Sequence, residues 1–180
     1  MKLTLKGKRK YITGADIINL FKNKLIHEKN IVFNFHKLTS NHLILKKNSK
    51  KDYKKSDLIC VITTSSKNKY IILEKKNKVT QRKDYDEKKL LANHNLKINS
   101  ITGKNNKFNF FDNIVALNKK LLNELIGKYK WVFCKLEIKR LNNLNFNQIK
   151  IELIDNSKNF YISKIIIEKK FIGKIYFYKK

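Results

Sequence analysis

The residues best suited to acid–base chemistry are a carboxylate at the expected start of a helix and a histidine in the strand that follows. Asp16 lies three residues after Thr13, a spacing typical of a helix start, and His36 lies in an apolar strand pattern. A carboxylate can act as a general base or nucleophile, and an imidazole exchanges protons near neutral pH. We therefore take Asp16 and His36 as candidate catalytic residues. The alternative is that Asp16 only stabilises the helix start and that His36 is a surface side chain.

Five further residues are candidates for substrate binding, each with a structural alternative. Asp112 stands at the start of a second expected helix, which it is predicted to cap. Glu137 shares one strand face with Trp131, but the stronger apolar pattern on the opposite face favours a surface position for Glu137. Arg82 and Arg140 are two of only three arginines in the chain, so each indicates either a selected contact of the planar guanidinium or chance.

No sequence pattern indicates a metal site or an organic cofactor. Cys60 and Cys134 lie inside apolar strand patterns, which is typical of core thiols rather than nucleophiles. The histidines lack metal-ligand spacing, and the five glycines are too scattered to form a phosphate-binding loop. We expect neither a metal nor a cofactor.

The elements that must position these residues follow the same order twice. A largely apolar helix over about 13–28 precedes four predicted strands, over 31–38, 42–46, 58–64 and 69–75. Residues 76–107 form a polar connection with a short helix through Leu90 and Leu91. A second helix from about 112, ended by Gly127, precedes four more strands, over 131–141, 146–154, 160–168 and 171–179, with a turn at 155–156.

This order predicts an α+β fold of two pseudo-repeated units, each with one buried helix and a four-strand antiparallel meander. The units cover residues 1–80 and 108–180, with a connection over 81–107. A single unit is too small to close a generous core, so we expect both to share one sheet in one compact domain.

The order of elements resembles the hotdog superfamily, in which a curved antiparallel sheet wraps a buried helix, and the tandem copy resembles a double hotdog. The resemblance implies acyl-thioester chemistry, on coenzyme A or an acyl carrier protein, beside the central helix. In thioesterases of this kind a helix Asp or Glu activates water or attacks the thioester, and in dehydratases a His works with an acidic residue. The dehydratase signature His-Gly-x-x-Pro cannot occur in a chain without proline, and Lys37 follows His36. This departure argues against a dehydratase.

The charge of the chain is a separate observation with its own functional implication. The formal net charge is +28, 39 of the 42 basic residues are lysine, and the charge is spread evenly along the chain. Such a composition is typical of coding bias, yet it still favours encounter with polyanions. A lysine cluster over 46–55 is either a solvated loop or a phosphate-contacting one.

Three functions therefore stay open from the sequence. The first is a hotdog-like protein that binds an acyl thioester, with or without thioesterase or dehydratase activity. The second is an RNA-binding or ribosome-associated protein that uses the lysine cluster, Arg9 and the aromatic residues of 160–178. The third is a structural protein. No apolar run approaches the roughly 18–20 residues of a membrane span and no secretory pattern is visible, so we expect a cytoplasmic protein with no membrane partner.

Overall fold

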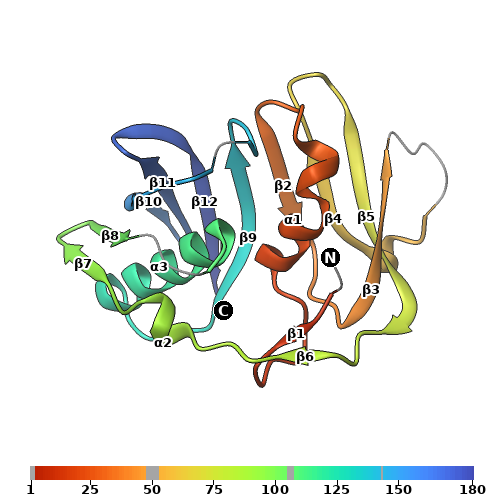
Figure 1. Ribbon diagram of the computed structural model, residues 1–180, viewed down its shortest axis with the longest axis horizontal. Helices are drawn as coiled ribbons and strands as arrows, with labels where there is room; N and C mark the ends of the chain where they lie inside the picture. The colour runs from red at the N-terminus through yellow and green to blue at the C-terminus, as the bar shows by residue number, and fades with distance from the viewer. Residues whose placement is uncertain (1–2, 48–52, 105–107, 143) are drawn as a thin grey trace.

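A ten-stranded antiparallel sheet curves around two helices in the computed structural model, which describes residues 3–47, 53–104, 108–142 and 144–180 (Figure 1). The strand order is β3-β5-β4-β2-β9-β12-β11-β10-β8-β7. The strands of the first half are β2 (Ile31–Phe35), β3 (Asn41–Lys47), β4 (Leu58–Thr63) and β5 (Lys69–Lys78). The other six are β7 (His94–Lys97), β8 (Ser100–Lys104), β9 (Trp131–Ile138), β10 (Gln148–Ser157), β11 (Phe160–Ile167) and β12 (Lys170–Lys179). The predicted α+β class, with one long sheet and few helices, is confirmed.

The two helices on the inner face of this sheet, α1 (Gly14–Phe21) and α3 (Phe110–Leu125), contact each other. A 3-10 helix over Lys22–Leu25 continues α1, so the predicted helix of 13–28 is shorter than expected. The tighter 3-10 turn directs Leu25 into the core while Lys22 and Lys24 stay exposed. Both helices therefore contribute to one core that spans the two halves.

The halves join where β2 pairs with β9. Ile31 lies opposite Ile138, and Phe33 lies opposite Leu136. All four side chains are at most 2% exposed. The seam between the halves is therefore as apolar as the interior of either half, and this one core agrees with the expectation that both units share a sheet.

The strand order differs from the simple meander predicted within each half. In the first half β3 lies at the sheet edge beyond β5, and in the second half β9 pairs with β12 rather than with β10. The connection also holds more structure than expected, because β7 and β8 form a hairpin that extends the sheet beside β10, next to the confirmed short helix α2 (Glu87–Leu90). The division into residues 1–80, 81–107 and 108–180 stays a prediction.

The turn predicted at 155–156 is wrong, because β10 continues to Ser157. The chain reverses instead near Lys158, where φ is +52°, and again at Glu168 and Lys169, both also with positive φ. Local composition favours Asn and Asp in turns, but the register with β11 carries the strand past both of them.

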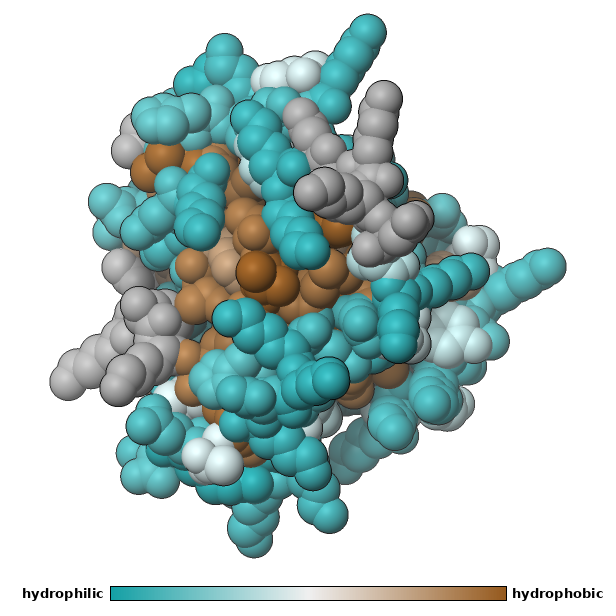
Figure 2. Space-filling model, turned by 90° about the vertical axis from the view of Figure 1, so that its right-hand side faces the viewer, coloured by the Kyte–Doolittle hydropathy of each residue, from teal (hydrophilic) through white to brown (hydrophobic). Residues whose placement is uncertain are grey.

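Outside the main core, a small apolar cluster lies on the outer face of β4 and β5. It consists of Leu58, Ile71 and Leu73, with Tyr53 and Val61 packed against them. Figure 2 shows an apolar area bordered by hydrophilic side chains on the side of the molecule that holds β3 and β5. Tyr53 belongs to the lysine cluster of 46–55, of which residues 48–52 lie outside the described part of the chain.

Candidate functional site

The helices α1 and α3 begin in the same way, and this places two aspartates in equivalent positions. The side chain of Thr13 accepts the backbone N–H of Asp16, and the side chain of Asn109 accepts that of Asp112. Each aspartate thus lies in the first turn of its helix, where the helix dipole favours a negative charge. The prediction that Asp112 itself caps the second helix is wrong, because the helix begins two residues earlier, at Phe110.

A buried lysine joins the two aspartates. Lys6 is 1% exposed, and its Nζ lies 2.8 Å from Oδ1 of Asp16 and also contacts Oδ1 of Asp112. Asp16 and Asp112 are themselves 3% and 5% exposed. We call these three residues the Lys6 triad. Because a buried charge is costly unless it is paired, each member depends on the others.

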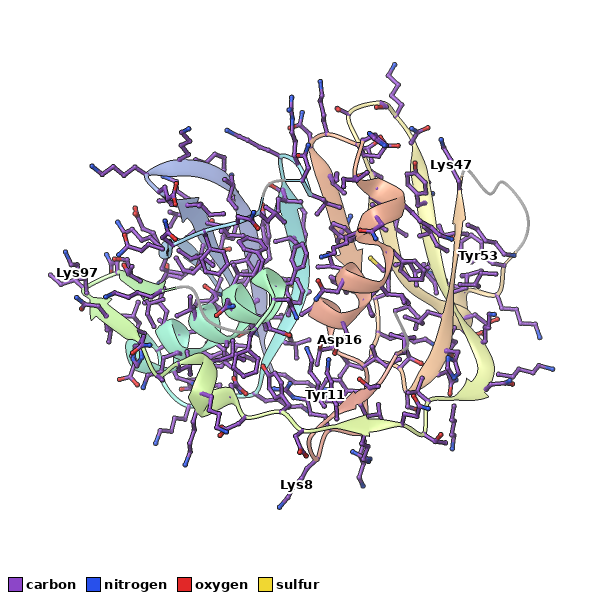
Figure 3. All side chains as sticks on the ribbon, viewed as in Figure 1. Lys8, Tyr11, Asp16, Lys47, Tyr53 and Lys97 are labelled. Carbon is purple, nitrogen blue, oxygen red and sulfur yellow. The ribbon has the colours of Figure 1, made fainter. Side chains whose placement is uncertain are left out.

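A short parallel strand pair delivers Lys6 to this position. The strand β1 (Leu5–Lys6) pairs with β6 (Arg82–Lys83), and the N–H of Gly7 donates to the carbonyl of Lys83 at 2.9 Å. Gly7 has φ +53°, which lets the chain turn directly after Lys6. Figure 3 shows Asp16 at the N-terminal end of α1, in the middle of the molecule, while the labelled Lys8 and Lys97 point outward into solvent.

Every oxygen of the two carboxylates has a partner. Oδ2 of Asp16 accepts the hydroxyl of Thr13 at 2.6 Å, and Oδ2 of Asp112 accepts the side-chain N–H of Asn109. The remaining oxygens bind Lys6. Neither carboxylate therefore presents a free oxygen to a substrate, and an attack or proton transfer by either requires Lys6 to withdraw.

Two further cations, Lys83 and Arg9, and the ring of Tyr85 lie close to the Lys6 triad. The ammonium of Lys83 lies 3.8 Å from Oδ1 of Asp16, and the ring centroid of Tyr85 lies 5.1 Å from Nζ of Lys6. Burial, followed by the charge of Asp112, raises the pKa of Tyr85 well above its ordinary value, so the phenol stays neutral. Arg9 stacks on Tyr85 at 4.6 Å and binds Glu87 at 3.0 Å.

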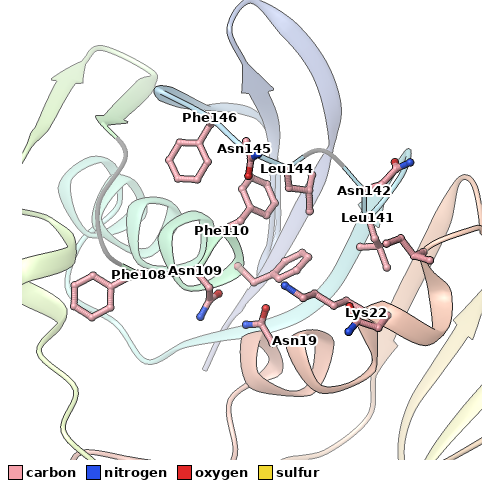
Figure 4. A pocket seen from close by; sticks show the side chains of 13 residues that line it. Asn19, Lys22, Phe108, Asn109, Phe110, Leu141, Asn142, Leu144, Asn145 and Phe146 are labelled. Atoms are coloured by element: carbon pink, nitrogen blue, oxygen red, sulfur yellow. The ribbon is translucent and has the colours of Figure 1, made fainter. Parts of the chain in front are cut away.

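Beside the triad, a cavity of about 440 Å³ opens between the start of α3, the end of α1 and residues 141–142 and 144–146 (Figure 4). Its apolar wall contains Phe108, Phe110, Leu141, Leu144 and Phe146. Its polar wall contains asparagine amides and one cation, from Asn19, Asn23, Asn109, Asn142, Asn145 and Lys22. This size and mixture of linings are typical of small-ligand sites.

Two asparagines in the polar wall of the cavity, Asn19 and Asn109, differ in their hydrogen bonds. Asn19 is 7% exposed, and its Nδ2 has no hydrogen-bond partner among the described residues. Such an unpaired donor is costly to bury. Asn109 lines the same cavity and donates to Asp112, so the cavity wall is one hydrogen bond away from the Lys6 triad.

The two predicted catalytic residues lie in different places. Asp16 is buried in the Lys6 triad, whereas His36 is exposed and borders a small cavity of about 70 Å³ with Gly14 and Phe35. No described contact joins Asp16 to His36. A joint acid–base role for them stays a prediction that this geometry does not support.

None of the five predicted binding residues lines the cavity beside the Lys6 triad, although Arg140 directly precedes Leu141 in its wall. Arg82 donates to the carbonyls of Gly7 and Arg9, which fixes the turn after β1, and Arg140 is exposed just after β9. Trp131 is a core residue whose Nε1 donates to Asn123 at 2.8 Å, and Glu137 binds Lys135 at 2.7 Å. Burial alone would raise the pKa of Glu137. The hydrogen bonds from Lys135 and Tyr176 and the nearby lysine charges together have a larger, opposite effect, so the pKa is lowered from its ordinary value.

A β-bulge explains why neither predicted face of the strand 131–141 is correct along its whole length. Phe133 pairs with Phe177 and Lys135 pairs with Tyr176, so Cys134 is an extra residue on β9. In a regular strand Trp131 would face away from Leu136 and Ile138, because odd and even positions point to opposite sides. The extra residue reverses this alternation, so all three side chains are buried on the same side. The surface position favoured for Glu137 agrees with the structure.

The two cysteines are free, and Cys60 is a core residue as predicted, whereas Cys134 is only half-buried and lies outside the core. Burial raises the pKa of the Cys134 thiol to about 11 and that of Cys60 further. Within the described ranges no three His, Cys, Asp or Glu side chains gather as metal ligands. No helix among the described residues is long and apolar enough to cross a membrane.

Comparison with solved structures identifies the fold. A protein assigned as a thioesterase II from Thermobifida fusca YX matches with a TM-score of 0.51 and 6% identity over 97% of this chain and 88% of that chain. The dehydratase domain of RzxB from Pseudomonas fluorescens matches with a TM-score of 0.51 and 7% identity over 93% and 85%. The tesB protein of Mycobacterium avium subs paratuberculosis matches with a TM-score of 0.50 and 7% identity over 99% and 91%.

The chain therefore has the hotdog fold that the order of its elements predicted. The matches cover both halves, which agrees with the double-hotdog arrangement. Comparison of the sequence with protein-family models and with curated proteins finds no match. At 6–7% identity the similarity lies in the backbone, so the function must be argued from this chain's own residues.

Proposed function

We propose that this protein binds an acyl thioester, carried by coenzyme A or an acyl carrier protein, in the cavity between α1 and α3. The observation that carries the proposal is a cavity with an aromatic and aliphatic wall and an opposite wall that contains Asn19, whose buried Nδ2 is unpaired. The fold, which this chain shares with proteins described as thioesterases and dehydratases, supports the same class of ligand.

In this proposal each wall of the cavity binds a different part of the ligand. The acyl chain packs against Phe110, Leu144 and Phe146, where it is removed from water. In this proposal the Asn19 side chain, whose Nδ2 is buried and unpaired, turns toward the cavity and donates to the thioester carbonyl. The phosphates of coenzyme A, or the acidic surface of a carrier protein, remain outside, where Lys22 and the net positive charge attract them.

The proposal is for binding rather than turnover. Lys6, Thr13 and Asn109 together occupy all four carboxylate oxygens of Asp16 and Asp112, the two aspartates nearest the cavity. Hydrolysis is a second candidate because Asn109 connects the cavity to Asp112. It would require Lys6 to leave Asp112 when the ligand binds.

The test is isothermal titration with acyl-coenzyme A species of increasing chain length, with free coenzyme A as the reference, at high salt. We expect binding that requires the acyl chain and survives salt, because burial of apolar surface is not screened. Asn19→Leu and Phe146→Ala should each weaken binding about tenfold, while Asn156→Leu, at an exposed position on β10, should leave it unchanged. Equal, salt-sensitive binding of free coenzyme A would overturn the proposal.

A parallel assay of released thiol separates binding from hydrolysis. No release above the rate in buffer is expected from the protein with Lys6 in place. Release that is lost in Asp112→Asn would replace the binding proposal by a thioesterase.

A further inference from the structure

The outer face of the sheet in the second half carries a surface that the proposed function does not use. Alternate side chains of β11 and β12 point away from the core: Phe160, Ile162 and Lys164 on β11, and Lys174, Tyr176 and Tyr178 on β12. No helix covers this face in Figure 1, because α1 and α3 lie on the inner side and α2 at one end. We call these six residues the outer-face grid.

Aromatic rings form one end of the grid. Phe160 lies opposite Tyr178 in the register, their ring centroids are 5.2 Å apart, and Phe160 is 50% exposed. Tyr176 lies one row further along β12, and the ammonium of Lys135 lies 4.6 Å from its ring centroid. Phe160 is exposed and the two tyrosines are half-buried, so the rings offer partly open flat surfaces on which nucleobases can stack.

Two lysines face each other at the centre of the grid. Lys164 and Lys174 are directly opposite in the register of β11 and β12. Like charges in this position destabilise a sheet. Each lysine also lies opposite a glutamate of its other neighbouring strand, Lys174 opposite Glu137 and Lys164 opposite Glu152, and its charge helps to lower the pKa of that carboxylate. The same two glutamates bind Lys135 and Lys150 at 2.7 and 2.8 Å, so each is shared between two lysines. Four lysines therefore surround two glutamates on this face, and the excess positive charge can attract an anion from solution.

From this combination we propose that the outer-face grid binds single-stranded nucleic acid, with phosphates at Lys164 and Lys174 and bases stacked on Phe160 and Tyr178. A duplex fits less well because its bases are already stacked and its edges do not reach exposed rings. A second copy of this chain would bring lysines against lysines in a protein of net charge +28. The near absence of arginine predicts binding without sequence preference, since the bidentate recognition of guanine is missing.

Fluorescence anisotropy with a labelled 15-nucleotide oligo-uridine, at several salt concentrations, tests this proposal with the whole protein. Lys164→Gln with Lys174→Gln should lower the slope of log affinity against log salt by about 1.4, or 0.7 for each lost phosphate contact on a single strand. Phe160→Ser should weaken binding about tenfold with the slope unchanged, because stacking carries no charge.

The matched control is Lys88→Gln with Lys89→Gln, which removes the same charge from the exposed helix α2. If it weakens binding as much as the Lys164 and Lys174 variant, the interaction is with the total charge and the proposal is overturned. Equal affinity for a duplex of the same length, or for vesicles with anionic lipid, overturns it as well. Circular dichroism melting should show all variants folded, and none of the substitutions touches the acyl cavity.

Discussion

Asp16 and Asp112 occupy the same place in two helices of the chain, the third residue after the capping side chain, and bind one ammonium between them. The two halves of the fold thus meet at an ionic contact as well as through their shared core. Lys6 supplies one positive charge to two negative ones, and Lys83 at 3.8 Å from Asp16 adds a weaker compensation. The triad leaves neither aspartate with a free carboxylate oxygen.

Replacement of Lys6 by Met should destabilise the protein strongly. Removal of the buried cation leaves two carboxylates facing each other, which typically costs about 3–5 kcal/mol. Urea unfolding followed by the fluorescence of Trp131, the single tryptophan, measures the loss. Lys83→Met, at a side chain 40% exposed, should cost at most about 1 kcal/mol. Similar losses in both variants would show that the triad is not a special contact.

Asparagine at both acidic positions should rescue the Lys6→Met variant in part, because neutral side chains remove the repulsion. The triple variant Lys6→Met, Asp16→Asn, Asp112→Asn is therefore expected to be more stable than Lys6→Met alone. A triple variant that is less stable than the single one would contradict the assigned charges.

The sequence predicts the place of Asp16 and the parallel with Asp112, because helix capping is a local pattern. It does not predict Lys6, which reaches both residues only because two residues of β1 pair with β6, far along the chain. A strand of two residues has no periodicity to detect. Asn19 and Asn109 are missed for a related reason, since polar residues on an expected helix give no sign that they line a cavity.

Gly14 at the start of α1 should tolerate no side chain. A Cβ there would lie 2.6 Å from Cδ1 of Phe133, so Gly14→Ala forces the helix away from β9 or moves the ring, at about 1–3 kcal/mol. Thermal unfolding should show the loss, and Phe133→Leu in the same chain should recover part of it. If the losses in free energy of unfolding from Gly14→Ala and Phe133→Leu simply add in the double variant, the two residues are not in contact and the prediction is wrong.

Much of the fold could be predicted because hydrophobic periodicity reports the buried face of each helix and of most strands. The failures are non-local. The bulge at Cys134 shifts the periodicity within one strand, and the order of β3, β4 and β5 is set by pairing that the sequence pattern does not encode. The extra hairpin of β7 and β8 is short and polar along β7, and it becomes a strand pair only by extending the sheet beside β10.

Acid should weaken the contact between Glu28 and Tyr70. The hydroxyl of Tyr70 donates to Oε1 of Glu28 at 2.6 Å, and this bond is the main cause that lowers the pKa of Glu28. The stabilisation is therefore present above the ordinary Glu pKa of about 4.3 and is lost as pH falls through the lowered value. Tyr70→Phe should cost about 1.5–3 kcal/mol at pH 7, and the difference should shrink toward pH 3. A difference independent of pH would contradict the hydrogen bond to the carboxylate.

The stabilisation by the contact between Glu28 and Tyr70 should also be lost at high pH. Burial, followed by the bond to Glu28, raises the pKa of Tyr70 to about 12. A raised phenol pKa gives stability that is complete below about pH 10 and disappears as pH rises through about 12. Denaturation curves above pH 10 should converge for the wild-type protein and Tyr70→Phe, and curves that stay apart would contradict the shift.

Two asparagines of α3 offer a contrast between a paired and an unpaired buried amide. Asn118 is fully buried, and neither its Oδ1 nor its Nδ2 has a partner within the described residues. Asn113, 2% exposed, donates to the carbonyls of Phe108 and Asn109 at 3.2 and 3.0 Å. An unpaired buried amide costs about 1–3 kcal/mol, so Asn118→Leu should raise the free energy of unfolding, whereas Asn113→Leu should lower it. Chemical denaturation of the two variants measures both signs, and a loss of stability in Asn118→Leu comparable to that in Asn113→Leu would show that Asn118 is a paired side chain after all.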